Sequence, residues 1–269
     1  MLILGLIGYP IGHSVSPAMH NAAMEHLGVE GIYLALEVRP QSLRDAVFGA
    51  KALGFKGLNV TIPFKEEVAK FFRLDGLASK IKAVNTLDLE RMLGYNTDAI
   101  GFIKALEEKI NPSDKVVLVV GAGGVGKAIA YALLEKGSKV IISNRTMTKG
   151  IQLAEKLSKY GDCHFHPYEK IGELEGELDI IVNATPLGME GFERKIPVPE
   201  ELLHDVLVFD TVYNPPETPL IRKAKEGGCK VVNGLDMLVY QGAESLRIWI
   251  GREPPIDVMR EAARKALGL

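Results

Sequence analysis

The stretch that decides the fold runs from Val116 to Thr146 and reads VVLVVGAGGVGKAIAYALLEKGSKVIISNRT. Its first five residues, 116–120, are apolar without alternation, which predicts a strand of a parallel sheet covered on both faces. A glycine turn follows, then an amphipathic helical pattern over 127–136 and a second apolar run at 140–142. This order predicts a β-α-β unit.

The turn carries the pattern G-x-G-x-x-G, formed by Gly121, Ala122, Gly123, Gly124, Val125 and Gly126. Small residues let the backbone approach a pyrophosphate, and the N–H groups and dipole of the following helix attract its charge. The pattern therefore predicts that these six residues bind a dinucleotide. The alternative is a tight turn that binds nothing.

The same residues also fit the phosphate-binding loop G-x-x-x-x-G-K, because Lys127 follows Gly126. That loop needs a Ser or Thr hydroxyl at the next position to hold magnesium. This chain has Ala128 there, so we favour a dinucleotide over a nucleoside triphosphate.

The end of the second apolar run indicates which dinucleotide binds. NAD sites usually place Asp or Glu there, about 20 residues beyond the glycines, to accept a hydrogen bond from the ribose 2′-OH. This chain instead has Asn144, Arg145 and Thr146 after Ser143. Without a carboxylate to repel it, a 2′-phosphate can lie against the Arg145 guanidinium. The sequence therefore predicts NADP as the cofactor, the alternative being a solvated Arg145 at a strand end.

Composition narrows the classes of function. The chain has 269 residues, 47% of them hydrophobic, which is enough for one large or two medium-sized domains, and the position of the glycine motif after residue 115 favours two. A net charge of −2 provides no basic surface, so we expect no nucleic-acid partner. No run approaches the ~20 apolar residues of a membrane helix, so we expect no membrane association. The two cysteines, Cys163 and Cys229, lack metal-binding spacing and suit a reducing cytoplasm, so we expect a cytoplasmic protein without a metal site.

The whole chain reads as α/β, with strand and helix patterns in alternation. We expect an N-terminal α/β substrate domain made of residues 1–98 and 237–269, and a Rossmann-type, doubly wound parallel-sheet domain over 99–236. The C-terminal helices would return to the first domain. Strand patterns lie at 2–7, 32–38, 57–60, 83–89, 92–96, 180–184, 207–212 and 230–232, and helical patterns at 16–28, 43–53, 99–108, 148–159, 220–227, 237–250 and 256–267.

Short polar side chains follow several strands of the first domain. Ser14 and Ser16 lie two residues apart in a loop rich in Gly and Pro, so both hydroxyls can converge on one anionic group. The alternative is that Ser14 is a turn residue and Ser16 caps a helix that has Pro17 at its first position. Lys65 would lie in the first turn of another helix, where the positive helix end eases release of its proton. A solvated surface lysine is the alternative there.

Nine stretches, in chain order, resemble the signature blocks of the shikimate dehydrogenase family. They are HSVSP at 13–17, NVTIPFK at 59–65, AVNT at 83–86, GYNTD at 94–98, GAGGVG at 121–126, NRT at 144–146, NATPLGM at 183–189, DTVYNP at 210–215 and GLDMLVYQ at 234–241. The resemblance implies an oxidoreductase of aromatic amino-acid (chorismate) biosynthesis, which reversibly reduces 3-dehydroshikimate to shikimate with NADPH. Its partners would be small molecules only, and the protein would be a monomer or a homodimer.

The resemblance also implies residue roles. Lys65 and Asp98 would be the catalytic pair and would contact substrate; Ser14 and Ser16 would bind its carboxylate, and Thr61, Asn85 and Gln241 its ring hydroxyls. Tyr213 would add a substrate contact, and Thr185, Gly234 and Met237 would join the cofactor site. Two alternatives stay open: a dehydrogenase that also uses quinate, and a dinucleotide sensor that catalyses no reaction.

Overall fold

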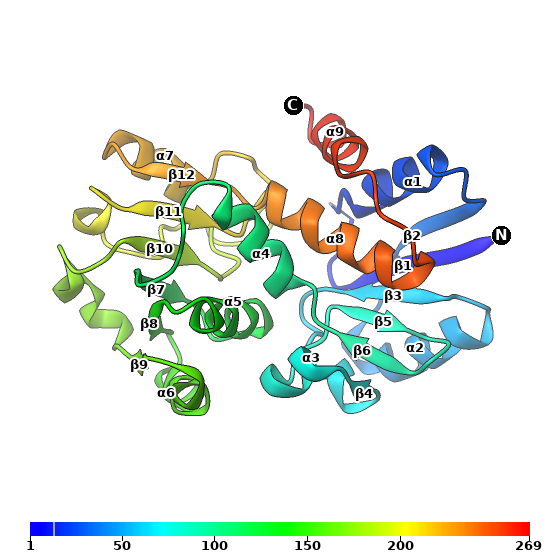
Figure 1. The fold of residues 1–269 in the computed structure, drawn as a ribbon, viewed down its shortest axis with the longest axis horizontal. Helices are drawn as coiled ribbons and strands as arrows, with labels where there is room; N and C mark the ends of the chain where they lie inside the picture. Colours follow the sequence, from blue (N-terminus) through cyan, green and yellow to red (C-terminus); the bar gives the residue numbers. More distant parts are fainter. Residues whose placement is uncertain (13) are drawn as a thin grey trace. The chain divides into compact units, whose positions relative to one another are not determined.

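The computed structural model describes residues 1–12 and 14–269, so His13 of the first quoted block lies outside the described residues. The chain divides into two compact units (Figure 1). The first unit is Met1–Gly101 together with Val239–Leu269, and the second is Phe102–Leu238. Over the described ranges, no helix is long and apolar enough to cross a membrane.

The first unit is built on a mixed six-stranded sheet with the order β2-β1-β3-β5-β6-β4. Strand β1 pairs in parallel with β2 and β3, whereas β5 runs antiparallel to β3 and β6. Its elements are β1 (Leu2–Gly8), α1 (Ser16–His26), β2 (Gly31–Glu37), η1 (Pro40–Ser42), α2 (Leu43–Ala52), β3 (Gly57–Val60), η2 (Val68–Lys70), β4 (Arg73–Leu74), α3 (Gly76–Ile81), β5 (Thr86–Asp88), β6 (Leu93–Tyr95) and α9 (Ile256–Ala266). Helices α4 (Asp98–Glu107) and α8 (Leu235–Ile250) each begin in one unit and end in the other.

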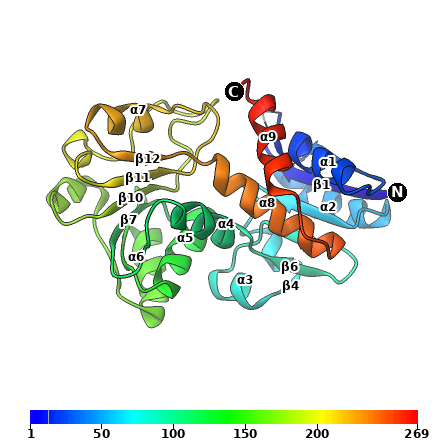
Figure 2. The same cartoon turned by 45° about the horizontal axis from the view of Figure 1, so that its top comes forward.

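The end of the chain completes the core of the first unit. Trp249, near the end of α8, lies against Gly57 of β3 so closely that a Cβ on this glycine would meet the indole nitrogen at 2.0 Å. The indole Nε1 donates a hydrogen bond to the carbonyl of Leu87 at 2.9 Å. Helix α9 packs beside α1, as Figures 1 and 2 both show. The predicted return of the C-terminal helices is therefore confirmed.

The second unit is a fully parallel six-stranded sheet with the order β12-β11-β10-β7-β8-β9. Numbered within the unit, this order is 6-5-4-1-2-3, which is the doubly wound arrangement with its switch point between β7 and β10. Its elements are β7 (Val116–Val120), α5 (Gly124–Glu135), β8 (Lys139–Ser143), α6 (Met147–Leu157), η3 (Ser158–Tyr160), β9 (Cys163–Phe165), η4 (Tyr168–Leu174), β10 (Ile180–Asn183), η5 (Glu200–Leu202), β11 (Leu207–Asp210), α7 (Pro219–Glu226) and β12 (Lys230–Val232).

The sequence of strand β7 does not alternate between apolar and polar residues because both of its faces are buried. Leu118 and Val120 pack into a core with Ile171 and Leu220 from η4 and α7. Val117 and Val119, which alternate with them along the strand, point to the opposite face and are equally buried, so both faces of β7 are covered. The predicted strand at 116–120 and the predicted β-α-β unit are confirmed.

The structure contradicts one local prediction and one alternative interpretation. Lys65 does not begin a helix: the chain makes turns at 62–67, and a short 3-10 helix follows at Val68–Lys70. The carbonyl of Lys65 accepts a hydrogen bond from the N–H of Val84 at 2.8 Å and so is bonded outside its own segment. Ser16 is not a helix cap either, because it is the first residue of α1 and Val15 precedes it as the cap. Helical elements at 76–81 and strands at 73–74 and 163–165 were not predicted.

His20 in α1 gives the first unit a sensitivity to acid. Its ring stacks on Tyr33 with centroids 4.2 Å apart, is fully buried, and has no hydrogen-bond partner among the described residues on either nitrogen. Burial lowers the pKa of His20 from 6.5 to about 3. Because the unfolded chain takes up this proton below pH 6.5 and the folded chain does not, the stability that His20 contributes at neutral pH is lost as the pH falls toward 3.

We expect His20→Phe, which keeps the stacked ring without a titrating group, to resist acid better than the wild type. At about 1.4 kcal/mol per pH unit, the wild type should lose about 2 kcal/mol more stability than the variant between neutral pH and pH 5. Denaturant unfolding at both pH values measures this difference. His26→Gln, on the exposed face of the same helix, is the control. Equal acid sensitivity of His20→Phe and wild type would contradict the account.

Candidate active site and dinucleotide site

Strand pairing brings the candidate substrate residues of the first unit to one edge of its sheet. Parallel strands β1 and β3 end side by side, with Ile7 opposite Val60, so the loop of the two serines lies next to the segment at 61–65. Strand β5 runs antiparallel to β3 and therefore starts at this same edge, just after Asn85. Strand β6, antiparallel to β5, ends there and leads to Asp98.

Lys65 and Asp98 form a buried ion pair. The ammonium Nζ of Lys65 lies 2.7 Å from Oδ2 of Asp98, and the two side chains are only 12% and 6% exposed. The other carboxylate oxygen, Oδ1, accepts a hydrogen bond from Nδ2 of Asn85 at 2.9 Å. The pair is thus fixed from both sides of the carboxylate, and the lysine keeps a small opening through which a ligand atom can reach its protons.

Asn85 connects this pair to the C-terminal helix α8. Its Nδ2 lies 3.1 Å from Oε1 of Gln241 and 2.9 Å from the hydroxyl of Thr97. Its Oδ1 accepts a hydrogen bond from the N–H of Thr97 at 2.7 Å, which fixes the orientation of the amide. Four predicted site residues, Lys65, Asp98, Asn85 and Gln241, therefore form one continuous set of contacts.

A buried polar layer, whose residues have no role predicted from the sequence, lies behind Asn85. Asn59 donates through Nδ2 to the carbonyl of Asn85 at 3.0 Å and to Ser245 Oγ at 2.9 Å, while its Oδ1 accepts from the hydroxyl of Tyr33 at 2.7 Å. Ser245 also lies 2.7 Å from the hydroxyl of Thr86. Two signals could have found this layer: a polar residue within a buried apolar strand, and a serine one helical turn after Gln241.

The remaining substrate candidates of the first unit make local contacts of their own. The Oγ of Ser14 accepts a hydrogen bond from the N–H of Ser16 at 3.3 Å, so the serines do adjoin each other. The methyl group of Thr61 lies over Gly8, where a Cβ would meet it at 2.4 Å. Across the described residues, no hydrogen bond joins the serines to the Lys65–Asp98 pair.

The glycine turn of the second unit has the geometry that a pyrophosphate needs. Gly121 adopts φ +117°, which favours glycine, and Gly126 packs so closely that a Cβ would meet the carbonyl oxygen of Gly121 at 1.9 Å. Gly123 caps α5 without any side-chain hydrogen bond, and the space where its Cβ would lie is open. No side chain of the cap occupies the first N–H groups of α5, which a helix start leaves available to an anion.

The side chain of Asn144 connects this turn to the end of β8 through hydrogen bonds. Its Oδ1 accepts a hydrogen bond from the N–H of Ala122 at 3.0 Å, and its Nδ2 donates to the carbonyl of Thr146 at 2.8 Å. Arg145 and Thr146 are exposed beside it. A phosphate bound to Arg145 would therefore lie against a segment fixed directly to the glycine turn.

The other second-unit candidates follow neighbouring strands. Thr185, after β10, donates from its N–H and its hydroxyl to Oδ1 of Asn183, at 3.0 and 2.6 Å. Tyr213 follows β11, and Gly234 lies at the start of α8, where a Cβ would meet the carbonyl oxygen of Thr211 at 2.1 Å. Met237 is buried in α8.

Asp210, the last residue of β11, is a fully buried carboxyl group. Its hydrogen-bond donors among the described residues are uncharged: Asn183, the N–H of Val212 and the hydroxyl of Thr218. Burial raises the pKa of Asp210 from 3.8 to about 6, although these hydrogen bonds act in the opposite direction. The folded state thus holds the proton more tightly than the unfolded chain. The stability that Asp210 contributes is present below pH 3.8 and is lost as the pH rises through about 6.

We expect Asp210→Asn, which cannot ionise, to lack this dependence. A shift of about two pKa units corresponds to about 3 kcal/mol, so the stability of the wild type relative to Asp210→Asn should fall by that amount between pH 4 and 7. Denaturant unfolding across this range measures it. If the difference in free energy of unfolding between the two proteins did not change with pH, Asp210 would not be a buried titrating carboxyl group.

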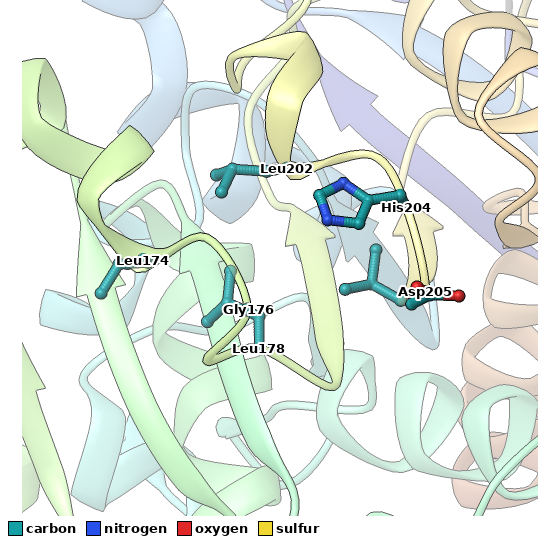
Figure 3. A pocket seen from close by; sticks show the side chains of 7 residues that line it. Leu174, Gly176, Leu178, Leu202, His204 and Asp205 are labelled. Carbon is teal, nitrogen blue, oxygen red and sulfur yellow. The ribbon is translucent and has the colours of Figure 1, made fainter.

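A separate cavity of about 260 Å³ lies at the opposite end of β10 and β11, where these strands begin. Figure 3 shows the side chains around it. It is lined by Leu174, Gly176, Leu178, Leu202, His204, Asp205 and Val206. Because Thr185 and Asp210 lie at the other ends of these strands, this cavity is not part of the dinucleotide site.

A doubly wound unit with an open glycine turn, joined in one chain to a unit with a buried lysine–aspartate pair, defines a two-domain, dinucleotide-dependent oxidoreductase. Three family models match the chain: the shikimate dehydrogenase substrate-binding domain at residues 6–87, shikimate/quinate 5-dehydrogenase at 104–190, and the shikimate 5′-dehydrogenase C-terminal domain at 234–264. The chain belongs to the shikimate dehydrogenase family.

Full-length relatives agree with this assignment. A shikimate dehydrogenase (NADP+) from Archaeoglobus fulgidus is 63% identical over 268 residues, which cover 99% of each chain. A crystal structure of a shikimate dehydrogenase in complex with NADP+ has a TM-score of 0.92 at 42% identity and covers 99% of this chain and 96% of its own. The Thermus thermophilus enzyme in complex with NADP(H) and shikimate has a TM-score of 0.89 at 39% identity, covering 99% and 100%.

Proposed function

We propose that this protein catalyses the reversible, NADPH-dependent reduction of 3-dehydroshikimate to shikimate. The observation that carries the proposal is the Lys65–Asp98 ion pair, which Asn85 holds and connects to Gln241. These four residues belong to four separate blocks of the family pattern, and the fold joins them. A protein that only sensed the dinucleotide would not require this arrangement.

The chemistry of the pair fits ketone reduction. NADPH supplies the hydride when it is bound. As negative charge grows on the carbonyl oxygen of the substrate, the Lys65 ammonium stabilises it and donates a proton to it. Asp98 orients the ammonium through its 2.7 Å contact and keeps the charge of the lysine compensated in a largely buried site. In the reverse direction, the neutral amine accepts the proton of the substrate hydroxyl.

The remaining residues would bind and orient the two ligands. Ser14 and Ser16 would hold the substrate carboxylate, and Thr61, Asn85 and Gln241 its ring hydroxyls, with Tyr213 as a further substrate contact. The pyrophosphate of NADP would bind at residues 121–126, and its 2′-phosphate at 144–146. Thr185, Gly234 and Met237 would complete the cofactor site.

A spectrophotometric assay of dinucleotide reduction, with shikimate or quinate and with NADP or NAD, tests the proposal in four combinations. We expect the largest kcat/KM for shikimate with NADP. One family model covers dehydrogenases of both shikimate and quinate, so quinate is the specific competitor. A larger kcat/KM for quinate would replace the proposed substrate, and no reduction in any combination would refute the proposed reaction.

A further inference from the structure

The buried carboxylate of Asp210 joins two loops of the second unit. Its Oδ1 accepts hydrogen bonds from Nδ2 of Asn183 at 2.9 Å and from the N–H of Val212 at 3.1 Å. Its Oδ2 accepts the hydroxyl of Thr218 at 2.6 Å. The donors come from the end of β10, from the loop after β11, and from the residue that caps α7.

Through Asn183, this carboxylate determines the shape of the loop after β10. The amide of Asn183 donates to both Asp210 and the carbonyl of Leu187, and its oxygen accepts both hydrogen bonds from Thr185. The hydroxyl of Thr185 in turn accepts from the N–H of Leu187 at 3.2 Å. The position of Thr185 therefore depends on an amide that Asp210 orients.

The glycine turn and the start of α8 rest on the same two loops. A Cβ on Gly121 would meet the carbonyl oxygen of Ala184 at 2.8 Å, so the turn packs directly on the residue after Asn183. Gly234 packs still more closely on Thr211, the residue after Asp210, where a Cβ would meet the carbonyl oxygen at 2.1 Å, and its N–H donates to the carbonyl of Val212 at 3.1 Å. Movement of either loop would displace a glycine of the proposed cofactor site.

Stability alone does not account for a carboxyl group at this position. Burial disfavours its charged form, as the raised pKa shows, and an uncharged residue would avoid that cost. A carboxylate does, however, accept hydrogen bonds at both oxygens, and so satisfies three donors from three segments at once. Buried ionisable groups that are retained at such a cost are concentrated at functional sites.

We propose that Asp210 is a positioning residue for the dinucleotide, which acts by holding the loops after β10 and β11 in the shape that Thr185, the glycine turn and Gly234 need to bind NADP. This inference rests on the proposed function, since it concerns the cofactor site of that reaction. Asp210 itself lies below the surface and would not touch the cofactor.

The test measures binding of NADP+ to wild type and Asp210→Asn by titration calorimetry, in parallel with binding of shikimate in the absence of nucleotide. Asn keeps one acceptor oxygen but turns an NH₂ group toward one of the three donors. We expect Kd for NADP+ to rise about tenfold. Kd for shikimate should change less than twofold. The kcat/KM for NADP+ should fall by about the factor by which the NADP+ affinity falls. Asp205→Asn changes an exposed aspartate two residues before the start of β11; it is the matched control and should bind NADP+ as the wild type does.

Thr218→Val provides a second variant in case Asp210→Asn folds poorly. It removes the donor to Oδ2 together with the hydroxyl oxygen that accepts the N–H of Ile221 at the start of α7, and we expect Kd for NADP+ to rise about threefold. Unchanged NADP+ affinity in both variants would overturn the proposal. Equal weakening of both ligands together with a lowered melting temperature would overturn it too, because it would indicate a purely structural role. Because binding is measured without turnover, a wild type that binds NADP+ but does not oxidise shikimate would refute the proposed function and leave this test intact.

Discussion

Lys65→Met should lower kcat for shikimate oxidation by about 10²- to 10⁴-fold, the range that general acid–base groups supply. Methionine approximates the length of the lysine side chain but cannot stabilise charge on the substrate oxygen or transfer its proton. Because other groups are proposed to bind the carboxylate and ring hydroxyls, Kd for shikimate should change far less than kcat. Steady-state kinetics together with equilibrium binding of shikimate separates the two effects.

Lys70→Met is the matched control, since Lys70 is an exposed lysine five residues further along the chain. We expect it to leave kcat unchanged within about twofold. If Lys65→Met instead weakened shikimate binding while kcat survived, Lys65 would be a binding residue and the proposed proton transfer would be wrong.

Arg145→Ala should raise KM for NADP+ by about 10- to 100-fold and leave KM for NAD+ nearly unchanged. The guanidinium is proposed to bind the 2′-phosphate, which NAD lacks, and charge-assisted hydrogen bonds are worth enough to give a change of this size. The hydrogen bonds of Asn144 hold the neighbouring backbone to the glycine turn, so Arg145→Ala should remove only the contact with the phosphate and leave the turn in place. Steady-state kinetics with both dinucleotides at saturating shikimate measure the ratio of KM for NAD+ to KM for NADP+.

Lys139→Ala removes an exposed cation at the other end of β8 and controls for the general loss of positive charge. It should leave the preference for NADP over NAD intact. Equal affinities of the wild type for the two dinucleotides, with no change of the ratio in Arg145→Ala, would show that residues 144–146 do not select the cofactor.

The fold of the second unit could be predicted because its signals are local. Non-alternating apolar runs such as 116–120 reflect burial on both sheet faces, and the glycine pattern reflects close backbone approaches that only glycine permits. The helix predicted at Lys65 was wrong for a non-local reason. The carbonyl of Lys65 bonds to Val84, a partner on another segment that no local pattern reveals. The two-residue strand β4 and the three-residue strand β9 are too short to show a periodicity.

The composition of the site could be predicted only in part. The residues themselves suggested a dinucleotide and its phosphate, but singly Asn85 and Asp98 are ordinary turn residues, and only the resemblance to a family selected them. The contact between Asn85 and Asp98 depends on strand pairing. The contact between Asn85 and Gln241, which lie 156 residues apart, depends on the return of α8. The layer around Asn59 was missed because its partner Ser245 lies 186 residues away, and the contact of Asp210 with Asn183 because it joins two separate strands.

The most direct test of the central claim is the reduction of 3-dehydroshikimate itself. Wild type and Lys65→Met are mixed with NADPH and 3-dehydroshikimate, oxidation of NADPH is followed by absorbance, and the product is identified by chromatography against authentic shikimate. The account predicts that wild type forms one shikimate for each NADPH oxidised, and that Lys65→Met does so at least about 100 times more slowly. Stoichiometric oxidation of NADPH without shikimate, or wild-type rates in Lys65→Met, would contradict it.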